Sequence, residues 1–303
     1  MTRIAVCLPL TDIQLKRLKA GTVGHTLSVL EPDAPCDCAI VFGNPEPDVI
    51  GANASLRWLQ LESVGLGEYL HLDWTRQAGL VKVTNLAGMF ANPAAESALA
   101  GILALYRVID QLVNLQARVE WQGGAVRPNM RLLSGARVVL FGYGSINRRL
   151  ADLLAPFGCT INPLASDWTD ESLNHALSSA DIVVSTVPEM PATENVFDAA
   201  RFARMPTGAI FCNFGRGSAV DESALDAALR SGHLGGAVID VTRQEPLPPD
   251  HPFWTCPNLL LTQHSGGGTS DEIDRKIDYF LANLALFHAG RPLTGLVDFS
   301  RGY

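Results

Sequence analysis

Cysteine is scarce in this chain, with six residues in 303. Only Cys36 and Cys38 stand close together, as a C-x-C pair, and neither a second pair nor a histidine cluster lies at metal-ligand spacing. Cys7, Cys159 and Cys212 fall in apolar, strand-like runs. The pattern therefore gives no indication of a metal site. It predicts that the cysteines are reduced and act as small core residues.

Positive charge and long apolar runs are also in short supply. The chain has 23 lysines and arginines against 31 acidic residues, which gives a net charge of −8. This charge argues against a general nucleic-acid binder, because such a protein needs a basic face. The most apolar stretch, residues 98–106, ends at Arg107, whereas a membrane span needs about 20 mostly apolar residues. The apolar N-terminus is broken by Pro9 and has no signal-peptide cleavage site, so it is interpreted as a strand. We expect a cytoplasmic protein that binds neither nucleic acid nor membranes.

The N-terminal part alternates strand-like and helix-like patterns. Residues 12–20 have helical spacing, and either Thr11 or Asp12 is able to cap that helix. Strands that alternate with helices predict βαβ units and a parallel sheet. The apolar runs that we interpret as strands are residues 4–8, 38–42, 56–61 and 81–83.

A long helix is predicted over residues 94–122, after Asn92-Pro93 breaks the chain. It is apolar on most faces, which indicates burial between domains or against another subunit. Beyond it, six strand-like runs follow with helical stretches between most of them, the count of a full doubly wound dinucleotide-binding sheet. These runs are residues 137–141, 159–164, 181–187, 209–214, 236–241 and 259–262.

The order of segments predicts a discontinuous N-terminal domain. A last helix over residues 271–288 would complete residues 1–92, so that the first domain comprises residues 1–92 and 269–303. Residues 93–268 would form the second domain, inserted into the first. The predicted fold class is α/β, with two doubly wound parallel-sheet domains.

A glycine turn between a strand and a helix is the first motif that indicates chemistry. The motif is Gly142-Tyr143-Gly144-Ser145-Ile146-Asn147. In a turn between a strand and a helix, glycines allow a pyrophosphate to approach the N-terminus of the helix closely. Asn147 replaces the third glycine, and we expect it to loosen the packing of the helix. The next strand ends in Ala165-Ser166-Asp167, without an acid at the position that binds ribose hydroxyls and without an adjacent Arg or Lys. The sequence therefore does not distinguish NAD from NADP as the cofactor.

Three polar side chains follow later strands, and each has an ordinary alternative. Arg216, between Gly215 and Gly217, suits a carboxylate, although a Gly-Arg-Gly taken alone favours a surface arginine at a turn. Glu245 lies in a proline-rich loop where a solvated carboxylate is usual, and His264 precedes a glycine run where a structural hydrogen bond is usual. Together they are more specific, because a carboxylate favours the charged form of a histidine that donates a proton to a carbonyl oxygen, while an arginine holds the substrate.

These residues together resemble the D-isomer-specific 2-hydroxyacid dehydrogenases over nearly the whole chain. The resemblance implies a flavodoxin-like substrate-binding domain (residues 1–92 and 269–303) and a Rossmann cofactor domain (residues 93–268). It places catalytic roles on Arg216, Glu245 and His264. It rests on Val64-Gly65-Leu66-Gly67, Asn92-Pro93-Ala94-Ala95-Glu96, Gly142 with Gly144, Val187-Pro188 with Thr193, Asn213 with Gly215-Arg216-Gly217, Asp240-Val241 with Glu245-Pro246, and His264.

The same resemblance implies the binding residues. Backbone groups of Val64, Gly65 and Leu66, with Arg216, would bind the substrate carboxyl group, and His264 would contact the substrate as well. Asp240 would contact the nicotinamide carboxamide. The implied cofactor site comprises Gly142, Tyr143, Gly144, Ser145, Ile146, Ser166, Val187, Pro188, Thr193, Phe214, Gly215, Asp240, His264 and Gly266.

Two features resemble the bacterial glyoxylate/hydroxypyruvate reductase A branch in particular. They are Gly88-Met89-Phe90 and the ending of the chain, residues 297–303. Trp121 matches a tryptophan that in related reductases reaches the partner's active site, although an anchor in a dimer interface is an equal alternative. Gln263 departs from the family, because a proline usually precedes the catalytic histidine.

The resemblance implies reduction of a small 2-oxo acid to the D-2-hydroxy acid by a homodimer that uses NAD or NADP. His264 would give the proton, Glu245 would hold it charged, and Arg216 would bind the carboxylate. One alternative is a dinucleotide-sensing corepressor, although no extended interaction tail is present. Phosphoglycerate dehydrogenase is a second, although no regulatory C-terminal domain follows. Formate dehydrogenase is a third, but it would carry glutamine in place of Glu245.

Overall fold

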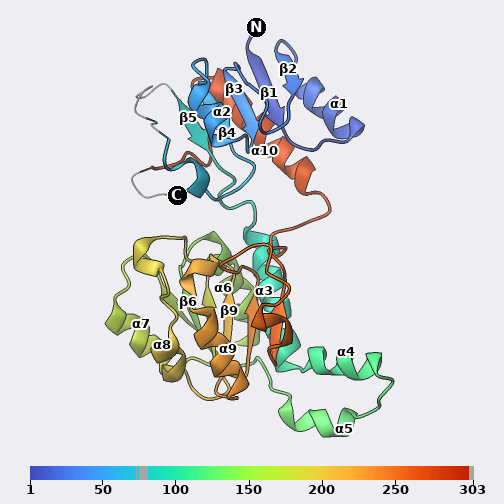
Figure 1. Cartoon of the computed structure of the whole chain (residues 1–303), viewed down its shortest axis with the longest axis vertical. Helices are drawn as coiled ribbons and strands as arrows, with labels where there is room; N and C mark the ends of the chain where they lie inside the picture. Colours follow the sequence, from blue (N-terminus) through green and yellow to red (C-terminus); the bar gives the residue numbers. More distant parts are fainter. Residues whose placement is uncertain (73, 75–80, 300–303) are drawn as a thin grey trace. The chain divides into compact units, whose positions relative to one another are not determined.

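The computed structural model describes residues 1–72, 74 and 81–299 (Figure 1). The chain divides into two compact units, Met1–Met89 with Thr269–Tyr303 and Phe90–Gly268. The first boundary lies at residue 89 and not at residue 92, because helix α3 (Ala91–Tyr106) begins ahead of Pro93. A proline in the first helical turn loses no hydrogen bond there. Residues 300–303 of the predicted terminal motif lie outside the described residues.

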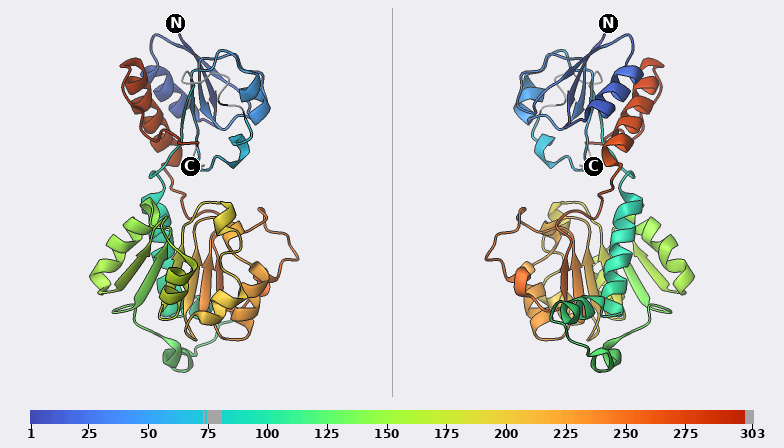
Figure 2. Two further views of the ribbon diagram at one scale, coloured as in Figure 1. Left: turned by 90° about the vertical axis from the view of Figure 1, so that its left-hand side faces the viewer. Right: turned by 90° about the vertical axis from the view of Figure 1, so that its right-hand side faces the viewer.

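The first unit is built on a five-stranded parallel sheet in the order β2-β1-β3-β4-β5, the flavodoxin-like order. Helices α1 (Asp12–Gly21) and α10 (Glu272–His288) cover one face, and α2 (Pro47–Ala52) lies on the other (Figure 2). The strands are β1 (Arg3–Cys7), β2 (Thr26–Val29), β3 (Ile40–Gly43), β4 (Trp58–Gln60) and β5 (Lys82–Thr84). Strand β2 was not predicted, because an edge strand that pairs only with β1 is largely exposed and carries no apolar run.

Helix α10 supplies part of the core of the first unit. Phe280 stacks on Phe42 with ring centroids 4.5 Å apart, and on Trp58 at 5.2 Å. All three side chains are fully buried. The C-terminal segment therefore packs on strands from the first quarter of the chain, which is the discontinuity that the order of segments suggested.

The second unit is built on a six-stranded parallel sheet in the order β11-β10-β9-β8-β6-β7. The chain runs from β6 to the edge strand β7 and returns to β8 on the other side of β6, which makes a topological switch point where ligands bind in such sheets. The strands are β6 (Arg137–Phe141), β7 (Thr160–Leu164), β8 (Ile182–Ser185), β9 (Ile210–Asn213), β10 (Gly236–Ile239) and β11 (Leu259–Leu261), and the prediction of six strands is confirmed.

Helices cover both faces of this second sheet (Figure 2). Helix α3 and helix α6 (Ser145–Leu154) pack on one face, where a side chain at Gly101 would come within 2.7 Å of Val238. The other face is covered by α7 (Asp170–Leu177), α8 (Ala199–Arg204) and α9 (Glu222–Arg230). The predicted α/β fold class is confirmed in both units.

The single long helix predicted over residues 94–122 is wrong. Helix α3 ends at Tyr106, and α4 (Ile109–Ala117) follows at an angle of 70°. Val108 adopts a left-handed backbone (φ 50°), and its buried side chain packs with Leu115 and Val126. This local burial outweighs the helical propensity of the stretch. In the described part of the chain, no single helix is long and apolar enough to cross a membrane; only the bent pair α3 and α4 together meets those criteria.

All six cysteines lie in the described part and are free. Burial raises the pKa of the Cys7 and Cys38 thiols to about 11, and it also raises the pKa of Cys212, which is fully buried in β9. These thiols are therefore protonated at neutral pH and act as small core side chains.

Candidate active site

The glycine turn after β6 leaves room for a ligand at the start of α6. Gly142 has φ +81°, and its N–H donates to Leu164 O at 2.9 Å. A Cβ on Gly142 would come within 3.0 Å of the backbone after β8, whereas a Cβ on Gly144 would meet no atom within 4 Å. Ser145 is exposed and Ile146 half-buried in the first helical turn, and the Tyr143 ring lies beside the turn. The unpaired N–H groups of a helix start fit the diphosphate of a dinucleotide.

Asn147 binds α6 to the sheet, contrary to the expectation that it loosens the packing. Its side chain is fully buried, and Nδ2 lies 3.1 Å from both Phe141 O and Gly142 O. Nδ2 also lies 3.3 Å from Val184 O, in the neighbouring strand β8. The amide thus connects the helix to the carbonyls of β6 and β8, on both sides of the switch point.

Replacing Asn147 with glycine should therefore destabilise the second unit, although glycine is the residue common at this position. We expect Asn147→Gly to lower the free energy of unfolding by about 2 kcal/mol, because buried carbonyls lose their donor and glycine adds its own helical cost. Urea unfolding followed by circular dichroism measures the change. Asn114→Gly, at an exposed position of α4, isolates the helical cost of glycine. Equal losses in the two variants would contradict the role of the Asn147 amide.

The loops after β7 and β8 carry four predicted cofactor residues. Ser166 is exposed after β7, while Val187 is buried and Pro188 exposed after β8. Thr193 is buried, and its hydroxyl donates to Pro188 O at 2.8 Å while accepting from Met190 N at 3.1 Å. Thr193 therefore shapes the turn from Pro188 onward.

Arg216 is held by a tight turn that follows β9. Asn213, the last residue of β9, accepts from Gly215 N at 3.1 Å and donates through Nδ2 to Arg216 O at 2.9 Å. A Cβ on Gly215 would lie 2.5 Å from Val187 O, so only glycine permits this approach, and Phe214 is buried beside it. Among the described residues, the half-buried guanidinium of Arg216 has one hydrogen bond, from Nη1 to Gly215 O at 2.8 Å. Its other N–H donors suit a bidentate carboxylate.

Asp240 joins the ends of β10 and β11. It is 7% exposed, and its Oδ1 accepts from Thr262 Oγ1 at 2.6 Å and from Gly266 N at 3.0 Å. Its backbone carbonyl accepts from His264 N at 2.6 Å. Sequence reasoning missed Thr262, for which the only signal was its position two residues before His264.

The structure brings Glu245 and His264 together. Oε2 of Glu245 lies 2.6 Å from Nδ1 of His264, and Oε1 accepts from Thr242 N at 2.9 Å. A carboxylate can only accept, so Nδ1 carries the proton and Nε2 is left for a ligand. The His264 side chain is 55% exposed. Sequence reasoning also missed Thr242, which fixes the second carboxylate oxygen.

The backbone at His264 is unusual and bears on the missing proline. Gln263 and His264 have φ values of +53° and +54°, a left-handed conformation that is rare for residues other than glycine and that clusters at active sites. Proline, with φ fixed near −65°, cannot adopt it. Gln263 is thus compatible with the turn that aims the His264 ring at Glu245.

The predicted carboxylate loop, Val64 to Leu66, belongs to the first unit. Asn85 Nδ2 donates to Val64 O at 2.9 Å, and Ser63 Oγ donates to Gly65 O at 3.2 Å. The Leu66 side chain is buried. These bonds fix the backbone of the loop directly after β4. The structure therefore places Val64, Gly65 and Leu66 in one unit, and every other predicted site residue in the second.

A buried lysine anchors the start of this loop. Lys276 Nζ of α10 lies 3.0 Å from Glu62 Oε2 and 2.7 Å from Glu272 Oε1. Burial alone would lower the pKa of Lys276, but the hydrogen bonds and charges of Glu272 and Glu62 outweigh it and raise that pKa. The ammonium is thus charged at neutral pH and neutralises two half-buried carboxylates.

Removing this charge should destabilise the first unit. We expect Lys276→Met to lower the free energy of unfolding by about 2 kcal/mol at pH 7, because the partly buried carboxylates lose their partner. Since the folded pKa is raised, this stabilisation is complete below the ordinary lysine pKa and is lost as the pH rises through the folded value. Urea unfolding at pH 7 and above pH 10.5 tests both statements. Lys16→Met, at an exposed site on α1, should change little, and an equal loss there would contradict the assignment.

Comparisons with known proteins agree with this geometry. Residues 99–266, more than half of the chain, match the NAD binding domain of the D-isomer specific 2-hydroxyacid dehydrogenases. Hydroxyphenylpyruvate reductase of Plectranthus scutellarioides is 30% identical, over 82% of this chain and 80% of the relative. Glyoxylate/hydroxypyruvate reductase A of Yersinia enterocolitica is 26% identical, over 89% of this chain and 88% of the relative.

A solved structure shares the fold of the whole chain. The D-isomer specific 2-hydroxyacid dehydrogenase of Xanthobacter autotrophicus Py2, in complex with NADPH and MES, is 25% identical with a TM-score of 0.82, and the match covers 100% of this chain and 99% of that one. The predictions of an enzyme and of an NAD or NADP cofactor are confirmed at the level of the family. The chain therefore belongs to the D-isomer-specific 2-hydroxyacid dehydrogenase family.

Proposed function

We propose that the chain reduces a small 2-oxo acid, of the glyoxylate or hydroxypyruvate kind, to the D-2-hydroxy acid with NADH or NADPH. The observation that carries the proposal is the 2.6 Å hydrogen bond between Glu245 and His264 at the carboxyl edge of the second sheet. A histidine paired with a carboxylate suits proton transfer, a step that cofactor binding alone does not include. The names of the relatives, reductases of glyoxylate, hydroxypyruvate and hydroxyphenylpyruvate, support the substrate class.

The second unit fits a dinucleotide. The open start of α6 at Gly144 suits its diphosphate, and the loops after β8 and β9 approach each other through Gly215. The buried carboxylate of Asp240 suits the amide N–H of a nicotinamide carboxamide. When bound, the reduced nicotinamide supplies the hydride for the carbonyl carbon.

His264 and Glu245 would complete the reduction. As the carbonyl carbon gains hydride, Nε2 of protonated His264 donates a proton to the carbonyl oxygen, which yields the hydroxyl group. The Glu245 carboxylate stabilises the charged imidazole at Nδ1 and holds the ring in place.

Arg216 would bind the substrate carboxylate through its remaining N–H donors. A bound carboxylate fixes the position of the adjacent carbonyl group. The arginine would also stabilise negative charge that develops on the carbonyl oxygen.

Absorbance at 340 nm tests the proposal directly. Purified protein is mixed with glyoxylate, hydroxypyruvate, pyruvate or phenylpyruvate, each with NADH and with NADPH. We expect oxidation of at least one reduced cofactor by the small acids, and the D-enantiomer as product in chiral chromatography when the product has a stereocentre. Tight cofactor binding without turnover of any acid would contradict the proposal and favour a dinucleotide sensor.

We also propose a homodimer in the cytoplasm, where reduced NAD(P) is available. The arm formed by α4 and α5 (Gly123–Val126) carries Val119 and Trp121, which are 94% and 100% exposed in the single chain. Exposed large apolar side chains on one segment mark an interaction surface. Light scattering after gel filtration should give twice the chain mass, and a monomer at micromolar concentration would contradict the dimer.

A further inference from the structure

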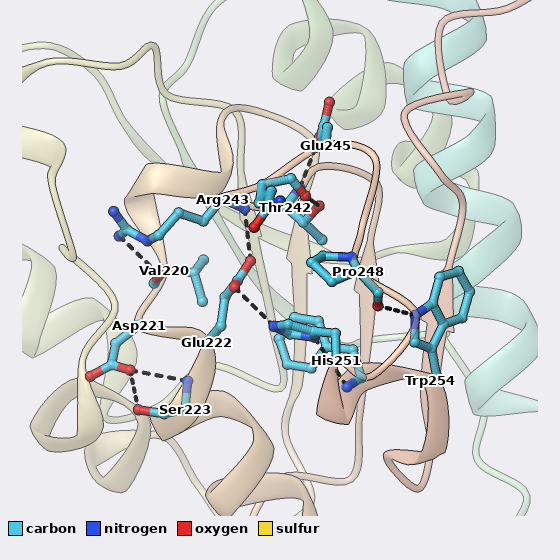
Figure 3. Close-up of polar contacts among 12 residues, drawn as sticks. Val220, Asp221, Glu222, Ser223, Thr242, Arg243, Glu245, Pro248, His251 and Trp254 are labelled. Atoms are coloured by element: carbon cyan, nitrogen blue, oxygen red, sulfur yellow. Dashed lines mark hydrogen bonds and ion pairs between the residues drawn. The ribbon is translucent and has the colours of Figure 1, made fainter.

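The loop that carries Glu245, residues 242–248, is held at its start and just beyond its end by one side chain from a different element. Glu222 is the first residue of α9, and its side chain is only 16% exposed. Its Oε1 accepts from the backbone N of Arg243 at 2.8 Å, and its Oε2 lies 3.3 Å from Nε2 of His251 (Figure 3). Arg243 precedes Glu245 in the chain and His251 follows it, so one carboxylate spans the loop.

The His251 end of this connection has a defined hydrogen-bonding direction. Nδ1 of His251 accepts from Phe253 N at 3.3 Å, so the N–H of the ring is on Nε2, the nitrogen that lies 3.3 Å from Glu222 Oε2. Trp254 Nε1 donates to Pro248 O at 2.7 Å and so holds the last residue of the loop (Figure 3). Glu222 therefore accepts a hydrogen bond from the Arg243 amide with one oxygen and contacts the His251 ring with the other.

The beginning of the loop is held more tightly still. The Arg243 guanidinium donates to Glu194 Oε1 at 2.7 Å, to Asn195 Oδ1 at 2.6 Å and to Ser218 O at 3.1 Å. Once the backbone of residues 242 and 243 is fixed, Thr242 N meets Glu245 Oε1, and the other oxygen of Glu245 is directed at His264. The chain of contacts thus leads from Glu222, through the Arg243 amide, to the imidazole of His264.

We propose that Glu222 is a positioning residue for the reaction: it touches neither substrate nor cofactor, and holds the loop so that Glu245 meets Nδ1 of His264. The inference rests on the proposed function for its kinetic consequence, but its structural consequence is independent of activity. A displacement of about 1 Å at a catalytic group is able to cost about 10²-fold in rate.

The test compares Glu222→Ala with variants that separate positioning from stability. Glu222→Ala should lower kcat about 10-fold to 100-fold, while the Kd of the reduced cofactor changes less than about 2-fold. Glu222→Gln keeps the acceptor for the Arg243 amide and should retain most of kcat. Asp221→Ala removes the N-cap of α9, because the Asp221 side chain accepts from Ser223 N and Ala224 N, and it breaks no hydrogen bond of the described residues 242–248. This variant should lower Tm and leave kcat unchanged.

Proton NMR gives a readout that needs no turnover. The Nδ1 proton of His264, bonded to a carboxylate, should appear as a far-downfield signal, assigned with nitrogen-15 histidine and by its absence in His264→Ala. The signal should disappear in Glu222→Ala, as in Glu245→Gln, and persist in Asp221→Ala. If Glu222→Ala does not fold, Glu222→Asp keeps the charge at the helix start but is one methylene too short to span the loop, and should give the same loss.

The outcomes distinguish the two proposals. If the wild type turns over no 2-oxo acid, yet the signal is present and depends on Glu222, the proposed function fails and the positioning role stands. If the folded Glu222→Ala or Glu222→Asp variant keeps both signal and kcat, the positioning role is overturned. Loss of kcat in Asp221→Ala equal to that in Glu222→Ala would also overturn it, because the effect would then follow from the stability of α9.

Discussion

His264→Ala should lower kcat for the 2-oxo acid by about 10³-fold while the Kd of NADH or NADPH stays within about 2-fold of the wild type. The imidazole is the group that donates the proton, and its ring is held by Glu245 rather than by the turn that accepts the diphosphate. Removing it deletes a group that acts only in the transition state, so kcat and kcat/KM should fall together. Single-turnover kinetics at 340 nm and cofactor fluorescence titration measure the two quantities.

The control for this variant is His175→Ala, an exposed histidine on α7 in the same unit. It should leave kcat and cofactor affinity unchanged. If His264→Ala loses as much cofactor affinity as kcat, the histidine contributes to cofactor binding. That result would contradict its assignment as the proton donor.

Gly217→Ala should also be strongly damaging, although the change adds a single methyl group. A Cβ on Gly217 would lie 2.0 Å from Thr242 C and 2.4 Å from Arg243 N, closer than atoms approach without bonding. These are backbone atoms, so the methyl group is accommodated only if the loop of residues 242–248 moves away, and Glu245 moves with it. We expect kcat to fall about 10²-fold, and the free energy of unfolding to fall by about 2 kcal/mol from overpacking.

A glycine with space around it provides the comparison for that variant. The nearest atom to a Cβ on Gly51, in α2, is Leu72 Cδ2 at 3.4 Å, an ordinary contact. Gly51→Ala should keep full activity and a Tm equal to or above that of the wild type, because alanine favours the helix. Steady-state kinetics and thermal unfolding of both variants decide the matter: a Gly217→Ala enzyme with normal kcat would mean that the loop does not need its present position.

Much of the fold was predictable because buried parallel strands have continuous apolar sequences. The six strands of the second unit and their crossovers follow from that pattern, and so do the positions of Arg216 and His264 just beyond strand ends. Strand β2 was missed because an exposed edge strand needs no such run. The break at Val108 was missed because it depends on the burial of one side chain against residues up to 18 positions away.

The site was less predictable than the fold wherever contacts cross between elements. Glu222 has the sequence signature of an ordinary acid at a helix start, and only its 2.8 Å contact with the Arg243 amide, 21 residues later, indicates more. Asn147 was misjudged because the loss of a glycine was visible in the sequence, whereas the three carbonyls that receive its amide were not. The left-handed backbone at Gln263 and His264 likewise has no signal in residue type.

The division of the first unit into two sequence segments has a consequence for biosynthesis. The second unit is one continuous segment, Phe90–Gly268, and all six strands of its sheet are synthesised before α10. Phe42 and Trp58 are among the first residues synthesised, yet their stacking partner Phe280 is among the last. The N-terminal strands must therefore wait with an uncovered apolar face while the inserted unit folds, so a nascent chain stalled before residue 272 would present that face to chaperones.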